Sequence, residues 1–79
     1  MNTSTLKASD VFARSVSFSK DKMNVFLADG RELSVPLEWF PRLRNATKKQ
    51  RERWRLIAGG IGIHWDAIDE DISVEGLLR

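Results

Sequence analysis

The chain has 79 residues, 42% of them hydrophobic and 30% charged, which is typical of one small globular domain. It contains no cysteine, which excludes disulfides, a cysteine nucleophile and thiolate metal sites. No apolar run approaches the ~20 residues of a membrane helix, and the first ten residues lack the apolar core of a signal peptide, so we expect a cytoplasmic protein with no membrane contact.

The polar residues 1–10 predict a flexible N-terminal segment, followed by a single domain over residues 11–79. Three strands are expected at the start of this domain, because apolar, β-branched and aromatic residues are separated there by turn-forming residues. These strands cover Val11–Ser19, Met23–Ala28 and Arg31–Val35.

The hairpin between the second and third strands has a predictable register. A three-residue loop over residues 29–31 gathers the apolar side chains of both strands on one face, whereas a two-residue loop does not. Gly30 supplies the left-handed backbone that such a loop needs. The expected cross-strand pairs are Leu27 with Leu33 and Val25 with Val35.

Helical signals follow the third strand. Pro36–Trp39 predicts a short helical turn, because proline ends a strand and fits the first position of a helix. Thr47 and Gln50 have the spacing of a capping box, which predicts a main helix over Lys48–Ala58 that ends at Gly59. Its apolar face contains Trp54, Ile57 and Ala58.

The last third of the chain predicts a strand, Ile61–Trp65, an acidic loop, Asp66–Asp71, and a final turn capped by Ser73. The expected fold class is therefore α+β. It consists of a small antiparallel sheet of three to four strands in β-β-β-α-β order, with the main helix packed on one face and a short C-terminal helical turn. The expected core residues are Val16, Phe18, Val25, Leu27, Leu33, Val35, Trp54, Ile57, Ile61 and Ile63.

The net charge of +2 hides an uneven distribution of charge. Residues 39–58 contain seven basic and one acidic side chain, whereas residues 59–79 contain five acidic and one basic. Four of the basic residues fall at i, i+4, i+7 and i+11 of the predicted helix and would form one stripe. They are Arg44, Lys48, Arg51 and Arg55. The stripe could contact the acidic tail, remain solvated, dock on an acidic protein surface, or lie along a phosphate backbone.

Trp39 and Phe40 lie in a turn before Pro41, where at least one of the two rings should be partly exposed. Exposed aromatic rings beside arginine are typical of protein interfaces. The alternative is that these rings only cover the end of the sheet. The candidate partner-binding residues are Trp39, Phe40, Arg42, Arg44, Lys48, Arg51 and Arg55.

His64 and the carboxylates of Asp66–Asp71 are the remaining candidates for chemistry. One histidine without cysteine cannot complete a zinc site, and no calcium loop, nucleophile elbow or phosphate-binding loop is present. We therefore expect no catalytic residue, no metal, no cofactor and no enzymatic activity. Asp69 or Asp71 is expected to accept a hydrogen bond from Arg42 or from backbone N–H groups.

Three segments of the chain, DGRELSVPLEWFPRL, ATKKQRERW and GGIGIHWDAIDEDISVEGLL, closely resemble the bacterial family named domain of unknown function 2442. The resemblance covers about Val11 to Leu78. It implies a small α+β fold with a three-stranded antiparallel sheet and no known enzymatic activity. Relatives are often encoded beside a second small protein, in pairs that look like toxin–antitoxin modules with this family in the antitoxin-like position.

We therefore expect a non-catalytic, antitoxin-like protein-binding module that neutralises or regulates a small partner protein, a toxin encoded nearby, by direct contact. The alternative is a nucleic-acid-binding transcriptional regulator that uses a basic helix over residues 44–55. A monomer or a homodimer is expected, since a free strand edge invites pairing between copies.

Overall fold

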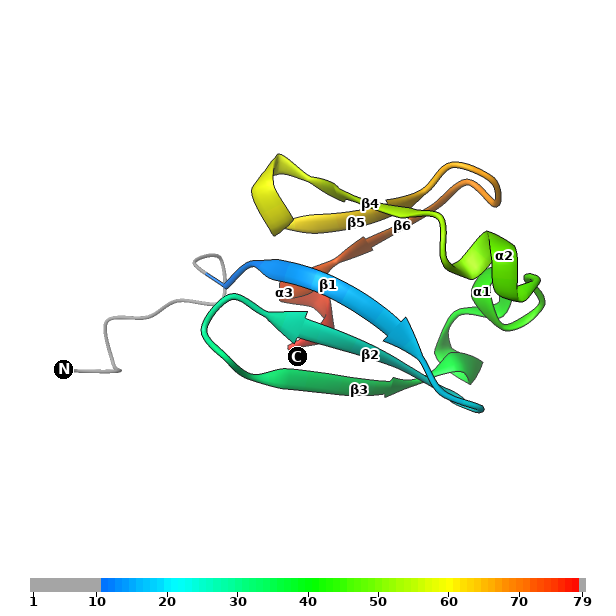
Figure 1. Ribbon diagram of the computed structural model, residues 1–79, viewed down its shortest axis with the longest axis horizontal. Helices are drawn as coiled ribbons and strands as arrows, with labels where there is room; N and C mark the ends of the chain where they lie inside the picture. Colours follow the sequence, from blue (N-terminus) through cyan, green and yellow to red (C-terminus); the bar gives the residue numbers. More distant parts are fainter. Residues whose placement is uncertain (1–10, 79) are drawn as a thin grey trace, which may run out of the picture.

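The computed structural model describes residues 11–78, so the flexible segment expected at residues 1–10 lies outside the described residues. The chain forms two three-stranded antiparallel sheets that face each other (Figure 1). The first sheet contains β1 (Ala13–Phe18), β2 (Lys22–Leu27) and β3 (Glu32–Pro36) in that order. The second contains β4 (Trp54–Ile57), β5 (Gly62–Trp65) and β6 (Glu70–Ser73).

The helical elements are all short. The first sheet is connected to the second through η3 (Leu37–Trp39), α1 (Pro41–Arg44) and α2 (Lys48–Arg51), which lie together at one end of the molecule (Figure 1). The other two are η4 (Ala58–Gly60), between β4 and β5, and α3 (Val74–Leu77), after β6. None of these described helices has the length and apolar character needed to cross a membrane.

The predicted α+β arrangement with a main helix packed on one sheet is wrong. The capping box is present, since Thr47 Oγ1 accepts from the Gln50 N–H at 3.1 Å and Gln50 Oε1 accepts from the Thr47 N–H at 2.9 Å. However, α2 ends after four residues, and the following residues form β4. Trp54 pairs with Trp65 and Leu56 with Ile63, so cross-strand burial determines this segment instead of helical periodicity.

The first hairpin has the predicted loop length but a different register. Its three-residue loop covers residues 28–30, because the Leu27 N–H donates to the Arg31 carbonyl at 2.8 Å, and Gly30 has a φ of 94°. Val25 therefore lies opposite Leu33, and Met23 opposite Val35. The predicted pairs are wrong by two residues, and a shift of two keeps the same side chains on the same face of the sheet.

The C-terminal predictions agree better with the structure. The strand expected at Ile61–Trp65 is confirmed as β5, and Ser73 caps α3 by accepting from the Gly76 N–H at 3.3 Å. The acidic loop is shorter than expected, because Glu70 and Asp71 already belong to β6.

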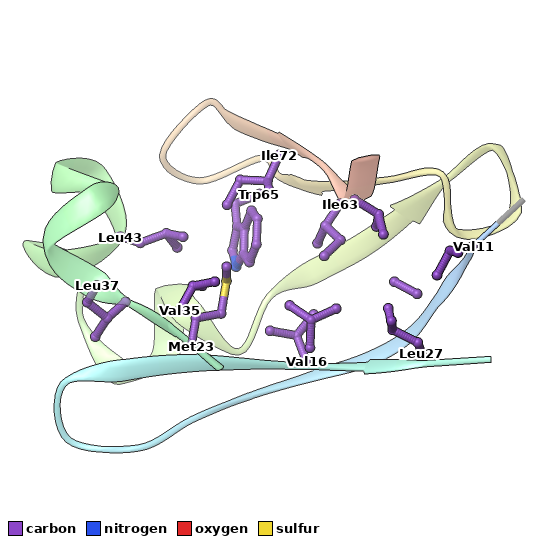
Figure 2. Packing of buried hydrophobic residues seen from close by; sticks show 13 residues of the cluster. Val11, Val16, Met23, Leu27, Val35, Leu37, Leu43, Ile63, Trp65 and Ile72 are labelled. Carbon is purple, nitrogen blue, oxygen red and sulfur yellow. The ribbon is translucent and has the colours of Figure 1, made fainter. Parts of the chain in front are cut away.

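The core lies between the two sheets, where Trp65 and Met23 point toward each other (Figure 2). Trp65 is fully buried and meets the ring of Phe18 edge-on, with 6.4 Å between ring centroids. Of the predicted core residues, five are buried: Val16, Val25, Leu27, Val35 and Ile63. Three more are half-buried against them: Phe18, Leu33 and Trp54.

Ile57 and Ile61 were predicted to be buried, and this prediction is wrong. Ile57 is 38% exposed on the outer side of β4, and Ile61 is 48% exposed before β5 begins. Five further large side chains are buried in the core, although they were not among the predicted core residues. These are Leu37, Leu43, Trp65, Ile72 and Val74.

Candidate functional site

The basic residues predicted to form one helical stripe do not share a helix. Arg44 ends α1, Lys48 and Arg51 belong to α2, and Arg55 lies in β4. The stripe prediction is wrong because the chain leaves the helical path after α2 and enters the second sheet. Arg55 is paired instead with Asp66, with 3.3 Å between Nε and Oδ2.

Arg51 is the most firmly held of these cations. Its Nε donates to the Leu43 carbonyl and its second terminal nitrogen to the Arg44 carbonyl, each at 2.8 Å. The Arg51 carbonyl in turn accepts from Trp65 Nε1 at 3.0 Å, and its guanidinium carbon lies 5.8 Å from the centre of the Phe18 ring. Both the backbone and the side chain of Arg51 are therefore tied to the core.

Two surface pockets adjoin Arg51. The larger, of about 640 Å³, is lined by side chains from the β1–β2 turn, the β3–η3 junction and the helices. Its lining residues are Lys20, Asp21, Lys22, Pro36, Leu37, Glu38, Arg44 and Arg51. The smaller, of about 410 Å³, is lined by residues 16–19 of the first sheet and its turn, together with Lys48, Arg51 and Glu52.

The basic residues of the two pockets form one surface, which we name the cationic end. It consists of Lys20, Lys22, Arg44, Lys48 and Arg51. Within residues 11–78, none of these five forms an ion pair. The sequence analysis missed Lys20 and Lys22, because only the folded hairpin brings its turn beside α1 and α2.

Trp39 lies in η3 and is 61% exposed, although several residues around it are buried or half-buried. Leu37 and Leu43 on either side are buried, and Phe40 packs half-buried against the core. The prediction that one ring of the Trp39-Phe40 pair is exposed is therefore confirmed.

Arg42 is exposed, and its side chain donates to the Asp69 backbone carbonyl at 2.6 Å. Arg42 therefore contacts the expected loop, but its partner is the main chain of Asp69 and not a carboxylate.

The outer face of the second sheet contains a row of ionisable side chains. Arg55, His64 and Asp71 lie directly opposite one another on β4, β5 and β6. His64 Nδ1 is hydrogen-bonded to Asp71, and its Nε2 lies 2.8 Å from Asp66 Oδ1. The two carboxylates approach different ring nitrogens, and within the described residues no group of three or more such side chains could hold a metal ion.

This row favours the charged form of the imidazole. The hydrogen bond that His64 donates to the Asp71 carboxylate raises the pKa of His64 above its usual value, and the negative charge of Asp66 acts in the same direction. The Arg55 guanidinium lowers the pKa of Asp66. With Nδ1 hydrogen-bonded to Asp71 and Nε2 close to Asp66, His64 connects β5 to β6 and to the loop between them.

We predict that thermal stability decreases as the pH rises above neutrality. A pKa raised by folding means that the stabilisation from His64 is fully present below the unfolded value of about 6.5 and is lost as the pH rises through the folded value. The pKa of Asp66 is lowered, so its contribution is lost at the acid end instead. Melting temperatures measured from about pH 6 to pH 9 should fall for the native chain and stay level for His64→Gln.

The chain has a single histidine, so its proton NMR titration can be assigned without ambiguity. Asp71→Asn should lower the observed midpoint, whereas Glu75→Gln, an exposed change on α3, should leave it in place. A midpoint at or below about 6.5 in the native chain would contradict the network described here.

Comparisons with known proteins agree with this architecture. A crystal structure of a protein of unknown function from Rhodospirillum rubrum ATCC 11170 is similar, with a TM-score of 0.73 and 24% identity over 86% of this chain and 84% of that chain. This likeness shows the fold alone. No curated protein matches the chain significantly. The model of the family described as protein of unknown function (DUF2442) matches residues 13–79, and the chain therefore belongs to the DUF2442 family.

Proposed function

We propose that this chain is a non-catalytic, antitoxin-like protein-binding module of the cytoplasm, which neutralises or regulates a small partner protein by direct contact. The observation that carries the proposal is the exposed indole of Trp39 beside the cationic end. Tryptophan and arginine are the residues that most often dominate binding energy at protein interfaces.

The rigidity of the Trp39 turn supports a binding role for its side chain. Leu37 and Leu43 anchor η3 and α1 in the core, and the Phe40 N–H donates to the Leu37 carbonyl at 2.9 Å. A partner that covers Trp39 therefore gains apolar burial without having to order a mobile loop.

The nucleic-acid alternative has less support from the geometry. It relied on a continuous basic helix over residues 44–55, and that segment is divided between two short helices and a strand. Arg55 and Arg42 already have partners within the chain, the Asp66 carboxylate and the Asp69 carbonyl. The cations that remain form a compact group around two pockets, which suits a protein surface better than an extended phosphate backbone.

Co-expression with the protein encoded beside this chain tests the proposal. The two proteins should elute together, and Trp39→Ala should weaken the complex about 30-fold, since a central tryptophan contributes about 2 kcal/mol or more. Ile61→Ala is the matched control: Ile61 is also exposed and lies beside η4, at the opposite end of the molecule (Figure 1), so the affinity should not change.

Salt distinguishes this function from the alternative. Between about 50 and 200 mM salt, a protein complex centred on Trp39 should lose only a few-fold in affinity, whereas a duplex DNA that covers four cations would lose about 100-fold. Failure to form any complex with the neighbouring protein, together with steeply salt-dependent DNA binding, would favour the nucleic-acid regulator instead.

A further inference from the structure

We propose that the larger pocket of the cationic end binds an acidic segment of the partner protein, with one carboxylate placed on the Arg51 guanidinium. This inference rests on the proposed function and specifies the chemistry of the partner. It is carried by the fixed position of Arg51 and by the cations that the fold brings around it.

Arg51 is prepared for an anion by its own backbone contacts. A guanidinium has five N–H donors, and the carbonyls of Leu43 and Arg44 use one on Nε and one on a terminal nitrogen. Three donors remain on a planar group that is already oriented, and the side chain lines both pockets. A carboxylate can therefore bind it with little further loss of side-chain freedom.

The other walls of the larger pocket complete the charge complementarity. Lys20 comes from the β1–β2 turn, Lys22 from the start of β2 and Arg44 from α1, so three parts of the chain bring basic residues to this pocket beside Arg51 of α2. A pocket of about 640 Å³ falls in the size range of ligand sites and is large enough for several side chains of a peptide.

The composition of the lining favours a peptide over a nucleic acid. Asp21 and Glu38 also line the larger pocket and would repel a continuous phosphate backbone. Pro36 adds apolar surface near the exposed Trp39. A segment with separate carboxylates and apolar side chains can contact the cations and the apolar surface while its charges stay away from Asp21 and Glu38.

The test is an NMR titration of the isotope-labelled full chain with hexaglutamate as the probe and hexaglutamine as the uncharged control. Hexaglutamate should shift the Nε–H signal of Arg51 and the amides of residues 20–22 and Arg44, and hexaglutamine should shift none of them. Lys20→Glu should weaken the peptide about three- to tenfold. Lys49→Glu is the matched control, since Lys49 is equally exposed and lines neither pocket, and it should change the affinity less than about twofold.

Three results would overturn the inference. The first is a set of shifts spread evenly over all exposed cations, or an equal effect of Lys20→Glu and Lys49→Glu, which would indicate unspecific attraction. The second is hexathymidylate binding at the same residues more tightly than hexaglutamate, which would assign the pocket to nucleic acid. The third is a partner complex that is lost in Trp39→Ala but unaffected by Lys20→Glu; this result would leave the proposed function standing. Absence of any partner complex would instead reject the proposed function, whatever the peptide titration shows.

Discussion

Trp65→Ala is expected to lower the free energy of unfolding by about 3–5 kcal/mol, the range for removing a buried tryptophan. Trp65 is fully buried between the sheets, packs edge-on against Phe18, and donates from Nε1 to the Arg51 carbonyl. A domain of this size has a total stability of about 4–12 kcal/mol, so the variant should be partly unfolded at room temperature. Urea denaturation followed by far-ultraviolet circular dichroism measures the change.

Two further variants separate the contributions of Trp65. Trp65→Phe keeps a ring in the core and removes the hydrogen bond, so it should cost about 1–2 kcal/mol. Trp39→Ala removes the same side chain from an exposed position and should change stability by less than about 0.5 kcal/mol. Equal losses in Trp65→Ala and Trp39→Ala would contradict the packing described for the core.

Gly60→Ala should be the most damaging single-methyl change in the described part of the chain. Gly60 has a φ of 116°, and a Cβ atom there would lie 2.4 Å from the Ala13 carbonyl oxygen and 2.9 Å from the Ala13 nitrogen. Backbone strain contributes about 1–3 kcal/mol, and displacing the strand adds about 1–3 kcal/mol. A combined loss of about 3–5 kcal/mol in urea denaturation is expected.

The neighbouring glycine provides the control for this prediction. Gly59 also has a positive φ, of 71°, but a Cβ atom there would meet nothing within 4 Å. Gly59→Ala should therefore lower the free energy of unfolding by only about 1–2 kcal/mol, the strain of an alanine in the left-handed conformation. Similar losses in the two variants would mean that Ala13 can move away from Gly60, and that the contact between β1 and η4 is loose.

The first sheet could be predicted from the sequence because its signals are local. Asp29 and Gly30 mark the turn, and the alternation of Met23, Val25 and Leu27 identifies the inner face. The exact pairing depended on whether the loop begins at residue 28 or 29, a choice that moves every pair by two residues without changing any face.

The first strand of the second sheet, β4, was missed because two periodicities fit the same residues. Trp54 and Ile57 have helical spacing, while Trp54 and Leu56 have strand spacing, and the glycines at 59 and 60 suit both a helix end and a turn between strands. The partners that decide between the two, Trp65 and Ile63, lie about ten residues further along the chain. A hairpin around the two glycines was the available signal.

The same error affected the candidate site. Arg51 lines one pocket with Arg44 and the other with Lys48, but Arg55 was added to these residues only because a helix was assumed. Lys20 and Lys22 carry no local sign of their position, since only tertiary structure brings the β1–β2 turn to Arg51. The contact between Arg42 and residue 69 was anticipated from charge, although it is made by the main chain.

Every described strand pairs only with a strand that is its neighbour in the chain. The residues of the first sheet end at Pro36, before any residue of the second sheet begins. A nascent chain can thus release its first three strands from the ribosome before the residues of the second sheet emerge. The apolar face of the first sheet then stays exposed until Ile63, Trp65 and Ile72 cover it. During this interval, other molecules can bind to the exposed apolar surface.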